Sequence, residues 1–266
     1  MNIVWLSLQI VLPVLFWSAY HYHKDRHLPE PPANLALCFL LGCAAAGISR
    51  LFYEGLGALN LRYDALELGL TDLPGLFAYA MLAIGPIEEL AKLLPFLLVV
   101  LRLRAFDEPL DGIIYASFIA LGYSSIENAY YLQYLTNVEA IARGFAGPLV
   151  HIMFASIWGY SIGRAHLQGR SLWQAALISL AIASSLHGIY DFLVLAEPLA
   201  ALPLSALLML MIWIWRMLLI RGIHSRSAHE DKCGICEVIA GLEGKAGNIP
   251  THAAANGQEV GGRRRR

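Results

Sequence analysis

Residues 75–101, GLFAYAMLAIGPIEELAKLLPFLLVVL, combine a long apolar run with a charged centre. A bilayer-spanning helix needs roughly 20 consecutive apolar residues, and this run exceeds that length. Its middle nevertheless carries Glu88, Glu89 and Lys92. Charged side chains inside a membrane are costly, and those that occur there usually face a bundle interior or cavity and serve a function. The stretch therefore predicts a membrane helix that helps to form a site.

The composition of the whole chain agrees with a membrane protein. Of its 266 residues, 58% are hydrophobic and 15% are charged, and the mean hydropathy is +0.56. An ordinary soluble domain has roughly 25% charged residues. These values exclude a soluble domain, a disordered chain and a disulfide scaffold, and the net charge of -1 gives no reason to expect nucleic acid. We predict an all-α fold, a polytopic membrane helix bundle with about seven transmembrane helices.

The predicted spans alternate with loops of different charge. The spans are 2–20, 34–57, 75–101, 112–134, 145–163, 172–195 and 202–220. Most Lys and Arg residues follow the first, third, fifth and seventh spans, whereas the other loops hold only Arg62 and Arg143 as basic residues. Because basic loops stay in the cytoplasm, we expect the N-terminus outside and the C-terminus in the cytoplasm.

Two polar segments interrupt or follow the spans. Residues His21–Pro32 (HYHKDRHLPEPP) form a Pro-rich connector that we do not expect to be helical throughout. We expect residues 1–222 to form one membrane-embedded domain, with its motifs between 75 and 195. Residues 223–266 are rich in Gly, Ala and polar residues and end in four arginines, which predicts a disordered cytoplasmic tail.

Further polar residues lie in other spans, at a depth similar to that of Glu88. They are Glu127 and Asn128 (in GYSSIENAYY), His151 (in GPLVHIMF), and His187 and Asp191 (in SSLHGIYDFL). With the N-terminus outside, all of them fall between mid-membrane and the outer half. Four helices thus deliver acids and imidazoles to one layer, which predicts a site open to the outer face. We interpret Arg50 and Glu54 instead as a self-neutralising pair, and the aromatic residues, Tyr123 and Trp158 included, as packing or interfacial.

Helical spacing assigns different directions to the paired glutamates. Lys92 is four residues from Glu88 and three from Glu89, so it can reach either carboxylate. Consecutive helical residues point about 100° apart, so the two glutamates should have different roles. Asp191 shares a helix face with His187 and is expected to fix its tautomer.

Four motifs in order resemble those of the PrsW-type intramembrane proteases, distant relatives of the CAAX prenyl endopeptidases and bacteriocin-processing proteins. Glu88–Lys92 (EELAK) resembles the motif EExxK, and Tyr123–Asn128 (YSSIEN) resembles FxxxEN with Tyr for Phe. His151 matches the histidine of the third motif, and His187–Asp191 (HGIYD) resembles HxxxD. The resemblance covers roughly residues 75–195.

The resemblance implies an endopeptidase that cuts a membrane-anchored protein near the outer face, such as an anti-sigma factor, in a bacterial inner membrane. It gives Glu88 the role of the base that activates water, and Lys92 would keep this carboxylate ionised. Glu89 would hold a neighbouring helix or orient the site. The histidines and Asn128 would donate hydrogen bonds to the water, leaving group or oxyanion, and Glu127 would share a proton with one of these groups.

Two questions stay open at this level. The sequence has no HExxH, so we favour a mechanism without metal, although His151, His187 and Glu88 are suitable zinc ligands. Intramembrane acids and histidines also occur in proton- or cation-coupled transporters, although no internal repeat supports this class. A non-catalytic chaperone or sensor on the same scaffold is a further alternative. The expected partners are the substrate protein and lipid, with no nucleic acid.

Overall fold

The protein is described here by a computed structural model that covers residues 3–24, 29–196 and 203–223. These residues form helices and connections and contain no strand. The chain divides into two units, Met1–Ile220 and Arg221–Arg266, and only the first is described at length. The tail from residue 224 onward, with its CxxC at Cys233 and Cys236, lies outside the described residues.

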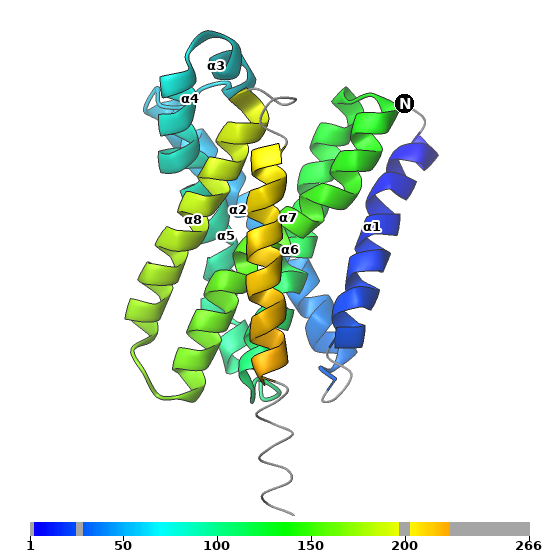
Figure 1. Cartoon of the computed structure of the whole chain (residues 1–266), viewed down its shortest axis with the longest axis vertical. Coiled ribbons are helices and arrows are strands. Elements are labelled where there is room, and N and C mark those ends of the chain that lie inside the picture. Colours follow the sequence, from blue (N-terminus) through cyan, green and yellow to red (C-terminus); the bar gives the residue numbers. More distant parts are fainter. Residues whose placement is uncertain (1–2, 25–28, 197–202, 224–266) are drawn as a thin grey trace, which may run out of the picture. The chain divides into compact units, whose positions relative to one another are not determined.

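Long helices run side by side through the first unit (Figure 1). In chain order the elements are α1 (Ile3–Lys24), α2 (Pro32–Ala58), α3 (Ala65–Thr71), α4 (Leu73–Tyr79), the π-helix η1 (Ala80–Ile84), α5 (Gly85–Leu98), the 3₁₀-helix η2 (Val100–Arg102), α6 (Pro109–Tyr131), the 3₁₀-helix η3 (Leu132–Tyr134), α7 (Asn137–Leu167) and α8 (Leu172–Ala196). A last helix, unlabelled in Figure 1, covers Pro203–Ile223. The all-α prediction is confirmed.

Five of these helices are long and apolar enough to cross a membrane: Val4–His23, Pro32–Ala58, Val138–Leu167, Leu172–Ala196 and Pro203–Ile223. The predicted count of seven is not confirmed by length and composition. The predicted span 75–101 is divided into α4, η1 and α5. The predicted span 112–134 is matched by α6, whose residues are nearly all buried from Leu110 to Ser125. Because other helices cover α6, it need not be as apolar as a lipid-facing helix.

The connector prediction is confirmed where the structure describes it. Helix α1 continues to Lys24, residues 29–31 are not helical, and α2 begins at Pro32. Proline suits the first helical position because its ring fixes φ and its missing N–H would have no partner there.

Glycines let the backbones of the central helices come into direct contact. A Cβ atom at Gly42 of α2 would overlap the carbonyl oxygen of Ile119 in α6, and one at Gly122 would overlap that of Phe39. A Cβ atom at Gly85 of α5 would overlap the carbonyl oxygen of Ser184 in α8. Small residues let membrane helices approach closely. Glu88 and Glu89, near the start of α5, are therefore held against the middle of α8.

The π-helix η1 lies immediately before the motif of α5. The backbone N–H of Gly85 donates to the carbonyl oxygen of Ala80, five residues earlier. Pro86 follows at the start of α5, where it cannot donate a backbone hydrogen bond. The helix is therefore irregular just before Pro86, where it forms a π-turn, a feature often found at functional sites.

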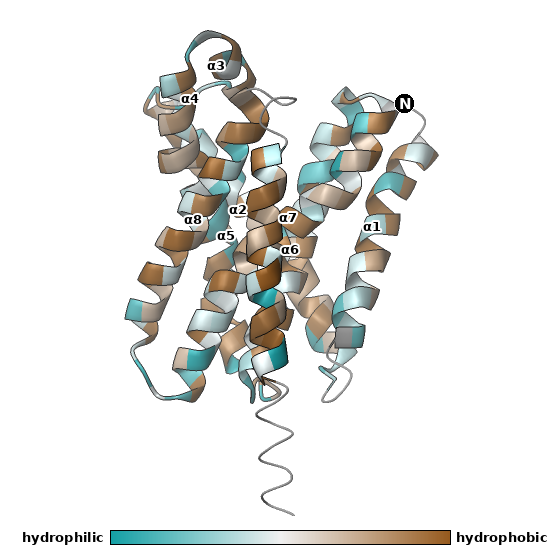
Figure 2. Ribbon diagram, viewed as in Figure 1, coloured by the Kyte–Doolittle hydropathy of each residue, from teal (hydrophilic) through white to brown (hydrophobic). Residues whose placement is uncertain are grey.

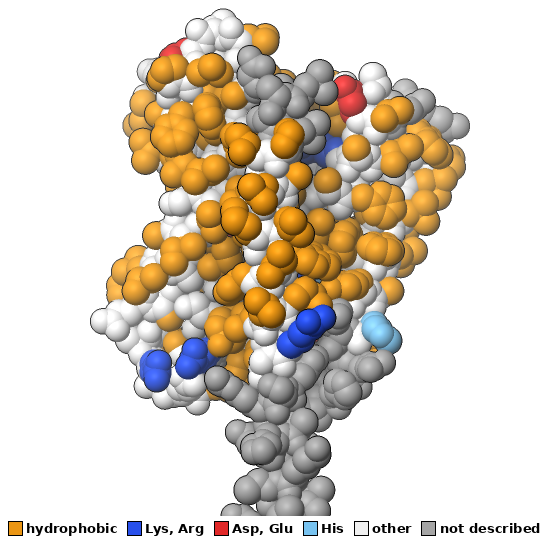
Figure 3. Space-filling model, in the orientation of Figure 1, with side chains coloured by type: hydrophobic (Ala, Val, Ile, Leu, Met, Phe, Trp, Pro, Cys, Tyr) orange, Lys and Arg blue, Asp and Glu red, His pale blue; other side chains and the backbone are white. Residues whose placement is uncertain are grey.

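The two ends of the bundle differ in charge. The connections between α5 and α6 and between α7 and α8 lie at the lower end in Figure 1, whereas α1 begins at the upper end. Most of the Lys and Arg side chains visible in Figure 3 lie toward the lower end, although basic colour also shows near the upper end. Hydrophobic colour covers most of the outer helix faces in Figure 2, with hydrophilic colour on α5 inside the bundle. This arrangement agrees with the predicted orientation, which stays a prediction.

Candidate active site

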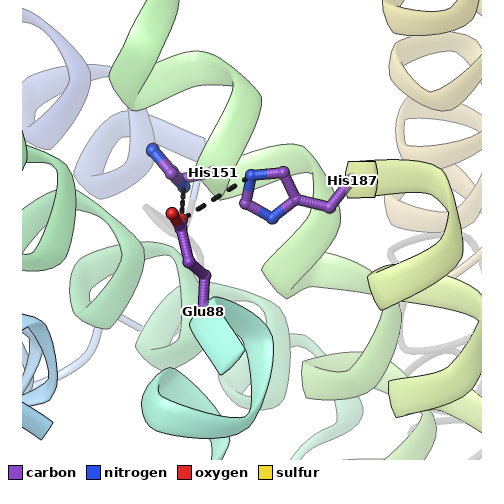
Figure 4. A group of neighbouring side chains, drawn as sticks. All are labelled: Glu88, His151 and His187. Atoms are coloured by element: carbon purple, nitrogen blue, oxygen red, sulfur yellow. Dashed lines mark ion pairs between the residues drawn. The ribbon is translucent and has the colours of Figure 1, made fainter. Parts of the chain in front are cut away.

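Three buried side chains from three helices meet inside the bundle (Figure 4). Glu88 extends from α5, His151 from α7 and His187 from α8. Oε2 of Glu88 lies 3.9 Å from Nδ1 of His151 and 3.7 Å from Nε2 of His187. One possible ligand atom from each residue lies within 4.8 Å of the other two. The structure thus brings these three predicted site residues together, and their roles stay predictions.

A second layer of carboxylates fixes both imidazoles. Nδ1 of His187 lies 2.8 Å from Oε1 of Glu89, and Nε2 of His151 lies 2.6 Å from Oε2 of Glu127. Each ring thus has one nitrogen bound to a carboxylate and the other on the side of Glu88. On that side Nδ1 of His151 is closest to Nζ of Lys92, at 3.0 Å, and Nε2 of His187 is closest to Oδ2 of Asp191, at 3.4 Å. A carboxylate on the far nitrogen fixes the tautomer and orientation of a histidine.

Lys92 is the positive centre of the cluster and is fully buried. Its Nζ lies 2.7 Å from Oε1 of Glu89 and 3.7 Å from Oε2 of Glu88. The same nitrogen lies 3.0 Å from Nδ1 of His151 and 4.3 Å from the ring centroid of Tyr123. The prediction that Lys92 reaches both glutamates is confirmed. A buried ammonium group needs such partners because it has lost its hydration.

The remaining predicted site residues differ in their contacts. Oδ2 of Asp191 lies 3.4 Å from Nε2 of His187, so Glu89 is the closer carboxylate to that ring. Asn128 is buried beside Glu127, but within the described residues its amide makes no hydrogen bond to the cluster. Its role as an oxyanion donor stays a prediction.

Two residues of the site were not predicted. Nη2 of Arg143 lies 2.8 Å from Oε1 of Glu127, although the sequence analysis placed Arg143 in an outer loop. The indole N–H of Trp158 donates to Oε2 of Glu89 at 2.9 Å, although the sequence predicted only a packing or interfacial role for it. Both residues lie on α7, and no spacing along the sequence indicates partners on other helices.

The exposed pair of Arg50 and Glu54 lies apart from this cluster. Nε of Arg50 is 3.0 Å from Oε1 of Glu54, and the side chains are 70% and 49% exposed. The prediction of a self-neutralising pair is confirmed.

Comparison with known proteins gives the cluster a context. Residues 30–229 match the family model described as PrsW family intramembrane metalloprotease. The chain belongs to this family. It is 30% identical to Protease PrsW of Clostridioides difficile (strain 630) over 218 residues, which cover 78% of this chain and 87% of the relative.

The chain has similar sequence identity to other members of the family, over similar shares of their length. The chain is 30% identical to Protease PrsW of Oceanobacillus iheyensis over 77% of its length and 89% of the relative. It is 28% identical to Protease PrsW of Bacillus subtilis (strain 168) over 70% of its length and 81% of the relative. No solved structure matches the chain.

Family membership makes the protein a membrane protease, and therefore a hydrolase. The predicted resemblance is confirmed, and the transporter alternative receives no support from these relatives. The family also implies a protein substrate in a membrane.

Proposed function

We propose that this protease cleaves a membrane-anchored protein near the outer face, and that Glu88, His151 and His187 hold a divalent cation for the reaction. The observation that carries the proposal is the convergence of their three ligand atoms within 4.8 Å. The family description, which names a metalloprotease, also supports it. This proposal replaces our preference for a mechanism without metal.

The donor set fits a divalent cation. Oε2 of Glu88 is buried and has no hydrogen-bond partner among the described residues. An imidazole nitrogen faces it from each of His151 and His187, while the other ring nitrogens are bound by Glu127 and Glu89. Nδ1 of His151 also lies 3.0 Å from Nζ of Lys92, so a cation bound there would replace this contact. Histidine metal ligands usually have such a carboxylate on their far nitrogen.

The charge of the cluster also supports a divalent cation. Its four carboxylates belong to Glu88, Glu89, Glu127 and Asp191, and its two cationic side chains are Lys92 and Arg143. With neutral imidazoles, two negative charges remain without a counter-charge in a largely buried site. Uncompensated buried charge is strongly unfavourable. A divalent cation would compensate this excess.

Each protein group then has a distinct task. A bound divalent ion would supply Lewis acidity, which makes hydroxide formation possible near neutral pH and polarises the peptide carbonyl. Glu89 and Glu127 hold the imidazoles in position. Trp158 and Lys92 hold Glu89, and Arg143 holds Glu127. We assign transfer of a proton toward the leaving amine to Asp191, whose side chain is 20% exposed beside His187.

The alternative mechanism without metal uses the same residues. Glu88 would accept the proton of the attacking water, and the two histidines would donate hydrogen bonds. Two protons on the imidazoles would then compensate the negative charge. This scheme gives Lys92 a direct role, because its ammonium group lies 3.7 Å from Oε2 of Glu88.

Access from the outer face agrees with the exposure of the site. The more exposed members of the cluster are Arg143, Glu127 and Asp191, with side-chain exposures of 34%, 19% and 20%. They lie near the start of α7 and the ends of α6 and α8, at the end of the bundle where α1 begins. We propose that this end faces outward in a bacterial inner membrane and that the substrate is a single-span protein of the anti-sigma-factor kind.

Metal analysis combined with a cleavage assay tests the proposal. The purified protein would be reconstituted in proteoliposomes with a library of single-span membrane proteins, and products would be identified by mass spectrometry. We expect cleavage, loss of cleavage with a strong chelator, and recovery with one divalent metal. Elemental analysis should find one ion per chain in the wild type, and the His187→Ala variant should lack it. Full activity after prolonged chelation, with no stoichiometric metal, would support the scheme without metal.

A further inference from the structure

A cavity of about 280 Å³ lies between the end of α7 and the start of α8. Arg164, in the last turn of α7, and Arg170, in the connection to α8, both line it, and we call it the basic cavity. This connection lies at the lower left of Figure 1, and basic side chains lie over it in Figure 3. Arg164 and His151 are separated along α7 by about 20 Å, at about 1.5 Å per residue. The basic cavity is therefore separate from the candidate active site.

The polar groups of the basic cavity suit an anion. Its two guanidinium groups have no ion-pair partner among the described residues, and Nη1 of Arg164 donates to the hydroxyl of Tyr160 at a distance of 3.5 Å. No acidic side chain is among the described residues that line the cavity. The side-chain amides of Gln168 and Gln174 add further N–H donors. Arginine side chains with free N–H groups are well suited to phosphate, which they can bind through two parallel hydrogen bonds.

The start of α8 adds to this preference for an anion. Ser171 precedes the helix, and its hydroxyl accepts a hydrogen bond from the backbone N–H of Gln174 at 3.4 Å. Both residues line the basic cavity, so the first turn of α8 borders it. The first turn of a helix carries a partial positive charge and N–H groups without helical partners, and phosphates bind there readily. The helix end therefore acts in the same direction as the two arginines.

The apolar border of the basic cavity indicates that the anion belongs to a lipid. Ile178 of α8 lines the cavity and is 63% exposed, and Trp173 in the first turn of α8 is 70% exposed. In a membrane-embedded bundle such apolar side chains face acyl chains, and Trp is typical of the interface between membrane and water. A free phosphate would use the arginines but not this apolar border. A phospholipid would use both.

We propose that the basic cavity binds the headgroup of an anionic phospholipid of the cytoplasmic leaflet, such as phosphatidylglycerol. Arg164 and Arg170 bind its phosphate, and the acyl chains lie along Ile178. Phosphatidylethanolamine binds less well, because its ammonium group meets two arginines and no acid among the described lining residues. Basic pockets between membrane helices at the cytoplasmic side bind phosphate headgroups in this way. The bound lipid joins the ends of the two helices that carry the histidines of the candidate active site.

Native mass spectrometry of the full-length chain in an uncharged detergent tests the proposal. Phosphatidylglycerol and phosphatidylethanolamine with the same acyl chains are titrated separately, and binding of the first lipid is quantified. One variant combines Arg164→Gln with Arg170→Gln. Its matched control combines Arg102→Gln with Arg104→Gln, which removes the same charge from two exposed arginines between α5 and α6. A third variant, Ser161→Phe, fills the basic cavity from α7 and keeps both of its arginines.

We expect the wild type to bind phosphatidylglycerol at least about fivefold more tightly than phosphatidylethanolamine. The Arg164 and Arg170 variant should bind phosphatidylglycerol about 10- to 30-fold more weakly, because each basic residue beside an anionic headgroup contributes about fivefold. Ser161→Phe should lose the preference for phosphatidylglycerol, whereas the Arg102 and Arg104 control should stay within about twofold of the wild type. Equal weakening in the two double variants, or an unchanged preference in Ser161→Phe, would overturn the proposal.

Competition with inorganic phosphate distinguishes a lipid site from a site for a free anion. At an equal free concentration, inorganic phosphate should leave phosphatidylglycerol bound, because it makes no contact along Ile178. Complete displacement would show that the cavity holds a free oxyanion and would overturn the assignment to a lipid. None of these measurements depends on proteolysis or on a metal ion, so their outcome is independent of the test of the proposed function.

Discussion

Two pairs of opposite charge in the same bundle have the same i, i+4 spacing but very different surroundings. Arg50 and Glu54 of α2 are 3.0 Å apart, with side chains 70% and 49% exposed. Lys92 and Glu88 of α5 are 3.7 Å apart, with side chains 0% and 10% exposed. The exposed pair has one mutual contact. Lys92 additionally contacts Glu89, His151 and the ring of Tyr123, because a buried ion needs several partners to replace water. Spacing therefore identifies a pair, and burial distinguishes a site from a surface feature.

The largest expected difference between the two pairs is in activity. Glu88→Gln should reduce cleavage of a reconstituted substrate by about 10²- to 10⁴-fold, because it removes the carboxylate that faces both imidazoles. The matched change Glu54→Gln should keep activity within about twofold. Rates measured in proteoliposomes decide this, with the amount of folded protein checked by gel filtration. Comparable losses in both variants would remove the distinction between the pairs.

The free energy of unfolding should distinguish Glu89 from Glu88. Glu89→Gln leaves Lys92 buried without its nearest anion and should cost about 3–5 kcal/mol of unfolding free energy. In protein freed of metal by a chelator, Glu88→Gln should cost less, because Oε2 of Glu88 has no hydrogen-bond partner among the described residues. Unfolding in mixed micelles with increasing SDS measures both variants. A smaller loss for Glu89→Gln than for Glu88→Gln would reverse the assigned roles.

Loss of a neutral hydrogen-bond donor to the buried cluster should have an intermediate effect on the free energy of unfolding. Trp158→Phe removes the indole N–H that donates to Glu89 and should cost about 1.5–3 kcal/mol, as for a hydrogen bond to a charged group. Trp173→Phe on α8, where Trp173 is 70% exposed, is the control and should be nearly neutral. The same SDS titration compares them. If Trp158 only fills space, the free energies of unfolding of the two variants will differ by no more than the difference in the apolar contacts that each one loses.

The smallest effect is expected for the exposed pair itself. Arg50→Gln should change the free energy of unfolding by about 0.3–0.5 kcal/mol, since exposed i, i+4 pairs contribute little. The measurement needs the precision of repeated SDS titrations. A loss of several kcal/mol would mean that this pair is covered in the membrane-embedded protein, which would weaken its use as the exposed reference.

The sequence predicted the residues at the centre of the site better than the residues that hold them in position. Glu88, His151 and His187 were identified because acids and imidazoles are unexpected in apolar spans. The contact between Lys92 and the glutamates followed from helical spacing alone. Arg143 and Trp158 were missed because a Trp in a membrane helix is ordinary, and an Arg near a helix end resembles a loop residue. Their partners lie on other helices, at separations of 16 and 69 residues.

The membrane-embedded helical class, the approximate depth of the polar layer and the four motifs were determined by the sequence, because hydropathy and helical periodicity are local properties. The tertiary structure decided which apolar runs are covered by other helices. It also divided the predicted span 75–101, which carries Glu88, by a π-turn before Gly85. It also decided that Glu89 and Glu127, on different helices, each orient one imidazole toward Glu88. These contacts depend on how closely α5, α6, α7 and α8 approach one another, and packing between distant segments sets that approach.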